Sequence, residues 1–417
     1  MKYLIQYVTL LFISTVFFQG CSQTHETEKK ALFIILDGIS ADVLEMIHTP
    51  YLDEVIETGG YTRAYLGGEA GGYSESPTVS AVGYNHLLTG TWSNKHNVYD
   101  NEIEEPNYNY WNIFRLFETN HPEKTTAIYS SWLDNRTKLV GGGIAEAGDI
   151  SIDIHFDGFE HDTLAFPHDD EGLYVQKIDQ HVSEMADQSI REDGPDLSWV
   201  YLWYPDSAGH YYGDGDKYYE SLRVADRQIG LIWEAVKYRE NNYNEEWLFI
   251  VTTDHGRRLP DGRHHGGQTE RERTIWFVTN ENNTNLHFAA SKPGIVDLYP
   301  TISRHLDLEL PGQLGYELDG VPLTGDLSLS HPAADYDPET GEISVTWKAW
   351  HEDGEVSVKI SRTNEFQEGR EDNYELVKQV PLIATEAVID VSDRPSDFYK
   401  IVMEGPHNSV NRWVIPE

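Results

Sequence analysis

Runs rich in apolar residues recur along the first three quarters of the chain, and most of them end at polar or charged residues. The runs occupy residues 31–36, 125–130, 197–203, 246–253 and 274–278. Between them, apolar residues recur at helical spacing over residues 41–58, 174–191 and 219–239. Continuous apolar strands are typical of a parallel sheet buried on both faces. The pattern predicts an α/β domain over residues 31–326, with a mostly parallel sheet flanked by helices.

The pattern changes after Leu327, where short stretches alternate between apolar and polar residues. These stretches occupy residues 343–350, 356–360, 374–377, 387–391 and 398–403. Short alternating strands separated by turn residues predict a small all-β sandwich of the immunoglobulin or fibronectin kind over residues 327–417. We expect this sandwich to be an accessory domain that folds independently and is dispensable for chemistry.

The first 21 residues have the pattern of an export signal. Lys2 precedes an apolar run over residues 3–18, and the run is followed by Gly20 and by Cys21, the single cysteine of the chain. This order is typical of a signal peptide, and Gly before Cys resembles a bacterial lipobox. Residues 1–21 are therefore predicted to be a signal peptide whose Cys21 is lipidated, as with palmitate, while residues 22–30 are predicted to be a tether. An ordinary signal peptide cut nearby is the alternative.

These features predict an exported lipoprotein of the bacterial cell envelope, held on the outer membrane through Cys21. The chain has 417 residues and a formal net charge of -39. Such a surface repels nucleic-acid backbones at long range, so no nucleic-acid partner is expected. An anionic substrate would need local positive charge, and bound metal cations are the obvious source.

Ser80 is the candidate nucleophile. It stands before a helical stretch that contains His86, Leu87 and Leu88. A hydroxyl in the first turn of a helix lies beside unpaired backbone N–H groups and the positive end of the helix dipole. This is a suitable place for a nucleophile that attacks a phosphoryl or sulfuryl group. The alternative is an ordinary helix N-cap, which is the commoner role of Ser at such a position.

Metal-ligand residue types follow several predicted strands. They are Asp37, then Asp206 with His210, then Asp254 with His255, and the adjacent pair His264 and His265 in a loop. Carboxylates and imidazoles are the ligands that zinc and similar divalent ions prefer. Because parallel strands end at the same edge of a sheet, these residues are predicted to meet there.

These motifs, in this order, resemble the alkaline phosphatase superfamily, and within it the type I phosphodiesterases and nucleotide pyrophosphatases. The matching segments are Ile34–Gly38, Thr49–Asp53, Pro77–Ser80, Leu88–Gly90, His96–Asn101, Pro205–His210, Thr253–Gly256, His265–Gly267, Val296–Thr301 and Leu318–Gly320. The resemblance covers about residues 31–323 and implies an alkaline phosphatase-like fold. It also implies a phosphoric ester hydrolase, with diesters favoured over monoesters and a small-molecule or glycan ester as substrate.

The resemblance further implies two divalent metal ions, typically zinc. Asp206, His210 and His265 would hold one ion, and Asp37, Asp254, His255 and Ser80 would hold the other. His265 is preferred to His264 because the family's ligand precedes Gly-Gly. Two such ions would lower the pKa of the Ser80 hydroxyl and stabilise the entering and leaving oxygens. Ser80 would form a covalent phosphoseryl intermediate that water then hydrolyses.

The chain departs from the family near its nucleophile. The nucleotide-specific branch has Thr where Ser80 stands and an Asn shortly afterwards, where this chain has Gly83. Asn85 and Asn101 are the candidates for binding the substrate in its place. Two alternatives stay open, a polysaccharide-linked sulfatase-like hydrolase and a non-catalytic surface lipoprotein that binds glycan. Residues 139–167 are rich in Gly and Asp and predict a loop that covers the site as a lid.

Overall fold

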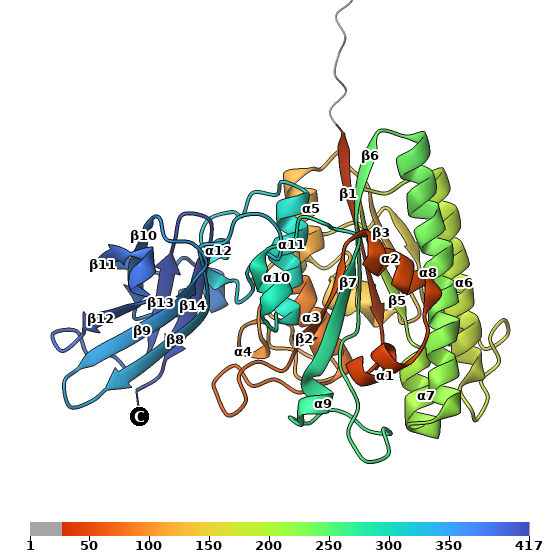
Figure 1. Cartoon of the computed structure of the whole chain (residues 1–417), viewed down its shortest axis with the longest axis horizontal. Coiled ribbons are helices and arrows are strands. Elements are labelled where there is room, and N and C mark those ends of the chain that lie inside the picture. The colour runs from red at the N-terminus through yellow and green to blue at the C-terminus, as the bar shows by residue number, and fades with distance from the viewer. Residues whose placement is uncertain (1–26, 417) are drawn as a thin grey trace, which may run out of the picture.

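The computed structural model describes residues 27–416, and its larger part is built on a seven-stranded sheet (Figure 1). The strand order is β2-β7-β6-β1-β5-β3-β4. The strands are β1 (Glu28–Leu36), β2 (Gly60–Tyr65), β3 (Thr126–Ser130), β4 (Ile154–Phe156), β5 (Leu197–Leu202), β6 (Glu245–Thr252) and β7 (Thr274–Thr279). The strands from β6 to β4 in this order are parallel, whereas β7 runs antiparallel to both β6 and β2. The predicted mostly parallel sheet is confirmed.

Helices cover both faces of the sheet (Figure 1). One face carries α3 (Ser80–Thr89), α5 (Ile113–Asn120), α10 (Leu286–Ala290) and α11 (Leu298–His305). The other carries α1 (Ala41–Met46), α2 (Pro50–Thr58), α6 (Leu173–Glu192) and α8 (Asp216–Asn242). The remaining α-helices are α4 (Ser93–His96), α7 (Tyr204–Tyr212), α9 (Glu270–Arg273) and α12 (Leu314–Glu317). Single 3₁₀ or π turns occupy Asn135–Leu139, Ala145–Ala147, Phe159–His161, Ile295–Asp297, Glu365–Glu368 and Leu382–Ala384.

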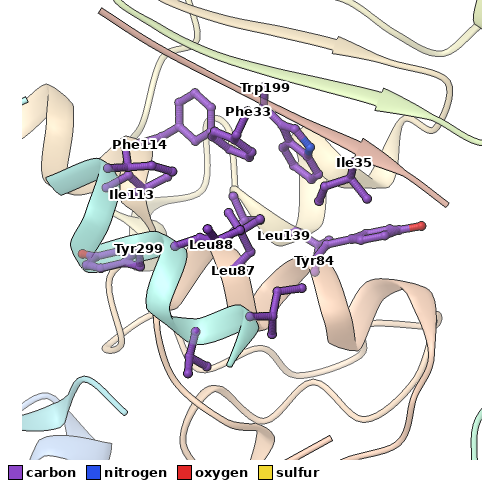
Figure 2. Close-up of a cluster of buried hydrophobic side chains, with 14 of the residues drawn as sticks. Phe33, Ile35, Tyr84, Leu87, Leu88, Ile113, Phe114, Leu139, Trp199 and Tyr299 are labelled. Atoms are coloured by element: carbon purple, nitrogen blue, oxygen red, sulfur yellow. The ribbon is translucent and has the colours of Figure 1, made fainter. Parts of the chain in front are cut away.

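The core beneath α3 fixes the position of that helix. Figure 2 shows Leu87 and Leu88 of α3 against the sheet, where the ring of Phe33 from β1 stacks on Trp199 of β5 at 5.9 Å between centroids. Every residue of α3 is buried, so the helix is packed on all sides. The helix therefore brings its N-terminal residue Ser80 to a fixed place at the carboxyl edge of the sheet.

Two predicted loop segments differ from the structure. β1 begins at Glu28, and Lys30 is buried with its Nζ 2.8 Å from Asp196 Oδ1, so the last three residues of the predicted tether belong to the sheet. Residues 1–26, with the predicted signal peptide and Cys21, lie outside the described residues. Within the predicted lid, Ile154–Phe156 forms the edge strand β4, because its backbone pairs with β3.

The C-terminal region is a sandwich of two antiparallel sheets, drawn in blue in Figure 1. Their strands are β8 (Leu329–Asp337), β9 (Glu342–Ala349), β10 (Glu355–Ser361), β11 (Glu375–Pro381), β12 (Glu386–Asp390), β13 (Tyr399–Glu404) and β14 (Ser409–Val414). The strand orders are β11-β10-β13-β14 and β12-β9-β8. The sequence pattern had predicted the five central strands but neither β8 nor β14. Over residues 27–416, no helix has the length and apolar character needed to cross a bilayer.

Candidate active site

The predicted site residues gather at the carboxyl edge of the sheet, which is its lower edge in Figure 1, near α1, α7 and α9. A cleft of about 540 Å³ opens there. Its lining includes Asp37 after β1, Ser80 in α3, Asp206 and His210 in α7, and His265 in the loop before α9. Asp254 and His255 follow β6 and lie fully buried beneath the cleft. Parallel strands place their ends at one edge, so residues far apart in sequence meet.

The first group of candidate ligands is Asp37, Asp254 and His255, whose ligand atoms lie within 4.8 Å of one another. His255 Nε2 is 3.3 Å from Asp37 Oδ1 and 3.3 Å from Asp254 Oδ2. The other oxygen of each carboxylate already has donors. Tyr84 Oη and Tyr201 Oη donate to Asp37 Oδ2, the second at 2.6 Å, and the Gly38 N–H donates to Asp254 Oδ1 at 3.0 Å.

This arrangement leaves Asp37 Oδ1 and Asp254 Oδ2 buried without a hydrogen bond, with His255 Nε2 3.3 Å from each. A buried carboxylate oxygen without a partner is costly, because it has lost its hydration. A divalent cation between the two oxygens would remove that cost. The donor set, two carboxylates and one imidazole, fits such an ion.

The second group is Asp206, His255 and His265, whose ligand atoms also lie within 4.8 Å of one another. The predicted ligand His210 lies beside this group with an exposed side chain. His210 Nε2 lies 3.3 Å from Asp206 Oδ2 and 3.1 Å from His265 Nε2, and His265 Nε2 lies 3.8 Å from Asp206 Oδ1. Asp206 and His210 are four residues apart on α7, so they share one face of that helix. Two imidazoles that face each other at hydrogen-bond distance beside a carboxylate fit a second divalent ion.

The imidazoles are oriented by backbone carbonyls. His255 Nδ1 donates to the carbonyl of Gly256 at 3.0 Å, and His265 Nδ1 donates to the carbonyl of Thr78 at 2.9 Å. A carbonyl can only accept, so the Nδ1 atoms carry the protons and Nε2 is the free ligand atom in the neutral ring. A hydrogen bond from the Nδ1–H of a candidate ligand fixes the tautomer of its imidazole ring and the orientation of that ring.

The electrostatics of the metal-free site follow from burial and from close charges. Burial opposes the charge on His255, but Asp254 and Asp37 outweigh it and raise the pKa of this imidazole to about 9. Burial, together with the charge on His255, lowers the pKa of His265 to about 3. The pKa of Asp254 is raised by burial and by Asp37. These shifts favour the protonated forms of Asp254 and His255 when no cation is bound.

Ser80 lies at the first position of α3, and its Oγ is 3.4 Å from His255 Nε2. The residue in the N-cap position is Val79, and no side chain caps the helix. The predicted alternative, in which Ser80 is a helix cap, is therefore wrong. The hydroxyl of Ser80 is free to face the cleft beside the candidate ligands.

The remaining predicted residues separate into those near the cleft and those away from it. Asn101 lines the cleft, and its Oδ1 accepts from the Ala81 N–H at 3.0 Å, whereas Asn85 is buried within α3 and does not line it. His264 is exposed beside His265 and outside the lining. At Gly83, a Cβ would lie 2.7 Å from the Asp254 carbonyl oxygen, which explains why no side chain stands there.

Sequence reasoning missed three residues that hold the candidate ligands. Tyr84 and Tyr201 donate to Asp37, and the fully buried Arg257 donates to Asp206 Oδ1 at 2.5 Å. Tyr84 follows Ser80 by four residues, so helical spacing could have found it. Tyr201 falls in a continuous apolar strand, and nothing in its local sequence marks it.

The outer wall of the cleft is aromatic and acidic. It is lined by Trp132, Tyr174, Trp203, Tyr211, Asp169, Asp170 and Glu171. These three acidic residues, which we call the acidic rim, belong to the segment before α6. The expected lid over residues 139–167 is wrong in its position, because the rim that lines the cleft follows it in the chain.

Comparison with known proteins agrees with this geometry. Residues 31–301 match the family described as type I phosphodiesterase / nucleotide pyrophosphatase, which covers the sheet and the candidate ligands. The protein belongs to this family, as its motifs had predicted. The C-terminal sandwich lies outside the matched residues.

A human relative is ectonucleotide pyrophosphatase/phosphodiesterase family member 1, which is 26% identical over 254 residues. The aligned part is 57% of this chain and 24% of the human protein, so the chain corresponds to about a quarter of that relative. The two proteins therefore share one region rather than their whole architecture.

Solved structures resemble the fold over most of the chain. A putative sulfatase from Bacteroides thetaiotaomicron matches with a TM-score of 0.51 at 12% identity, covering 88% of this chain and 86% of that one. The phosphonate monoester hydrolase of Agrobacterium radiobacter matches with a TM-score of 0.50 at 13% identity, covering 94% and 89%. These similarities confirm the alkaline phosphatase-like fold.

Proposed function

We propose that this protein is a phosphoric ester hydrolase that cleaves phosphodiesters, with Ser80 as nucleophile and two divalent ions, zinc, as cofactors. One observation carries the proposal. Asp37 and Asp254 each present one buried oxygen without a hydrogen bond, 3.3 Å from His255 Nε2, which itself lies 3.4 Å from Ser80 Oγ. A purely structural cluster would satisfy these oxygens within the protein.

Asp37, Asp254 and His255 would hold one ion together with Ser80. Asp206 and His265 would hold the other, with His210, whose Nε2 lies 3.3 Å from Asp206 Oδ2 and 3.1 Å from His265 Nε2. Ions bound there would supply Lewis acidity, which lowers the pKa of the serine hydroxyl and stabilises charge on the phosphoryl oxygens. The chain fixes most of this geometry, because Asp37, Ser80, Asp206, Asp254 and His255 are buried. His265 is half-buried in a loop and His210 is exposed on α7.

Ser80 would act as the nucleophile from the first turn of α3, where the positive end of the helix dipole favours an anionic phosphoryl group. Its Oγ forms a bond to phosphorus while the bond to the leaving alcohol breaks, and water later cleaves the phosphoseryl ester. Asn101 uses its Oδ1 to accept from Ala81, which leaves its amide NH₂ to donate to a phosphoryl oxygen.

The side chains that line the cleft indicate which chemical groups a substrate should carry. The aromatic rings of Trp132, Tyr174 and Trp203 offer flat apolar surface to an organic group. The acidic rim repels anions, so a polyanionic nucleotide is disfavoured and a neutral or cationic leaving group is favoured. A cation would also be attracted to the faces of the aromatic rings.

The test compares wild-type protein with Ser80→Ala and Ser80→Thr on matched phosphomonoester, phosphodiester and sulfate-ester substrates, with metal content measured in parallel. We expect wild type to contain two ions per chain and to cleave the diester best. Ser80→Ala should lose nearly all turnover while keeping its fold and most of its metal, because Ser80 supplies only one ligand oxygen. Ser80→Thr should keep part of the activity.

Three outcomes would contradict the proposal. Near-normal turnover of Ser80→Ala would end the nucleophile assignment. A preference for the sulfate ester would favour the sulfatase-like alternative. A wild-type protein without metal or turnover, but with affinity for glycan, would favour the non-catalytic alternative. Sensitivity of turnover to a chelator, reversed by added zinc, separates a metal requirement from unfolding.

The proposed location is the outer membrane of a bacterial envelope, through a lipid anchor at Cys21. The support is the sequence alone, with Gly20 and Cys21 at the end of an apolar run. A single acyl chain anchors a protein only marginally, so more than one chain is needed for stable attachment.

A further inference from the structure

Arg257 has a fully buried guanidinium directly beside a candidate metal ligand. Its Nη1 donates to Asp206 Oδ1 at 2.5 Å, its Nε donates to the carbonyl of Gly262, and its Nη2 donates to the carbonyl of Arg263 at 3.2 Å. One side chain therefore joins helix α7, which carries Asp206, to the loop that precedes His265.

The surrounding chain leaves space for this guanidinium. A Cβ at Gly209 would lie 2.4 Å from Arg257 Cζ, and a Cβ at Gly38 would lie 2.8 Å from its Nη1. These two glycines stand next to the candidate ligands His210 and Asp37. A larger residue at Gly209 would push the guanidinium away from Asp206, whereas one at Gly38 would also meet Asp206 itself, since its Cβ would lie 2.7 Å from Asp206 Oδ1.

The backbone of Arg257 is also held on both sides. Its N–H donates to Ser40 Oγ at 2.9 Å, and its carbonyl accepts from Arg271 Nη1 at 3.2 Å. Burying an arginine costs free energy that a methionine of similar volume would not cost, unless its charge and donors are fully paired. The pairing here is directed at one carboxylate oxygen and at one loop.

We propose that Arg257 is a positioning residue for the ion held by Asp206, His210 and His265, an inference that rests on the proposed two-ion site. By occupying Asp206 Oδ1, it leaves Oδ2 for that ion, on the side of His210. By holding the carbonyls of residues 262 and 263, it fixes the approach of His265 to Asp206.

Arg257 should affect the ion held by Asp206, His210 and His265 and not the other ion. The carboxylates of the other group are oriented by neutral donors, namely the hydroxyls of Tyr84 and Tyr201 and the N–H of Gly38. Removing the guanidinium therefore leaves the donors to Asp37 and Asp254 in place. The two ions should respond differently to a change at Arg257.

The experiment titrates zinc into metal-free full-length protein against a competing chelating dye, without any substrate. Wild type should bind two ions. In Arg257→Met and Arg257→Lys, one ion should bind 10- to 100-fold more weakly, and the other ion should keep its affinity. Loss of a hydrogen bond to a metal-ligating side chain usually has an effect of this size. Lysine should not rescue binding, because its compact ammonium cannot reproduce the planar guanidinium that donates to Asp206 and to the carbonyls of Gly262 and Arg263.

Two further variants sharpen the result. Gly209→Ala keeps Arg257 but displaces its guanidinium, and it should weaken the same ion even if Arg257→Met does not fold. The matched control is Arg239→Met, which removes another buried arginine, one paired with Glu245 at the opposite end of β6. It should lower the melting temperature without changing either zinc affinity.

Unchanged binding of both ions by folded Arg257→Met and Arg257→Lys would overturn the role of Arg257 and leave the two-ion site standing. Equal weakening of both ions would overturn it too, because a general loss of structure would then explain the result. Binding of fewer than two ions by wild type would overturn the two-ion site itself, and the inference with it.

Discussion

Lys400 Nζ lies 2.7 Å from Glu317 Oε1, and both side chains are fully buried. Lys400 belongs to β13 of the sandwich, whereas Glu317 ends α12 of the larger domain. Asp372, also buried, lies 2.7 Å from the same Nζ. Nearby, Lys95 of α4 donates to Asn411 Oδ1 of β14 at 2.8 Å. Buried charges thus join the two predicted domains.

Lys400→Met should destabilise the protein by about 3–5 kcal/mol, because Glu317 and Asp372 would remain buried without their cation. Denaturant unfolding measures the change. The matched control is Lys359→Met, a lysine of the same sandwich whose partner Glu404 is partly exposed. It should cost less than about 1 kcal/mol. Equal costs for the two variants would contradict this account of the interface.

Truncation after Leu323 should give a less stable catalytic domain than the whole chain, contrary to the expectation of a dispensable module. Removal of the sandwich would leave Glu317 without Lys400 and Lys95 without Asn411. The measurements are the melting temperature and the activity of the truncated protein on a small substrate. A truncated domain as stable as the full chain would restore the original expectation.

Metal binding at pH 7 should release at least one proton. In the metal-free protein the pKa of His255 is about 9, so its imidazole is charged at pH 7 and must lose a proton before Nε2 can bind an ion. The affinity of this site should therefore rise about tenfold per pH unit above pH 7 and level off near pH 9.

Calorimetric titration of zinc in two buffers of different ionisation enthalpy measures the released protons. The release due to His255 should disappear when the same titration is carried out above pH 9, which serves as the internal control. Binding at pH 7 without proton release would show that His255 is neutral in the metal-free protein or is not a ligand.

Neutralising the acidic rim should improve the cleavage of polyanionic substrates. Asp170→Asn with Glu171→Gln removes two exposed negative charges at the cleft, each worth about 1 kcal/mol at contact distance in water, or about fivefold in rate. The kcat/KM for a nucleoside triphosphate should rise several-fold, and that for a choline-containing diester should fall. Asp169 is left unchanged because it accepts from the Leu173 and Tyr174 N–H groups at the beginning of α6.

The control for the rim is Glu184→Gln, which removes an exposed charge on α6 away from the cleft lining. It should leave the ratio of the two rates unchanged. Added salt should reduce the effect of the rim variants, since exposed charges are screened. An unchanged substrate ratio in the double variant would contradict the role given to the rim.

Cys21 should carry lipid in the native protein, because its position after Gly20 and an apolar run is that of a lipobox. Mass spectrometry of protein extracted from membranes should find an N-terminus at Cys21 with acyl chains attached. Cys21→Ser should release the protein from the membrane fraction. An unmodified N-terminus at another residue would favour an ordinary signal peptide.

The sequence by itself determined the sheet and the positions of most candidate ligands. Continuous apolar runs mark strands that must be buried on both faces, and parallel strands end at one edge, so Asp37, Asp206 and Asp254 had to meet. The spacing of Asp206 and His210 is local to one helix turn. The start of β1 at Glu28 was missed because Lys30 is polar and yet buried by pairing with Asp196.

Only the tertiary structure decided which residues donate hydrogen bonds to the candidate ligands. Tyr201 and Asp37 are 164 residues apart, and Arg257 and Asp206 are 51 apart, so no local pattern connects them. The same holds for the charges that join Lys400 to Glu317, 83 residues apart. Local sequence sets strands and helices through hydrogen bonding and periodicity. Contacts of this kind arise only when packing brings distant elements together, and they fix which oxygen of each carboxylate faces the cleft.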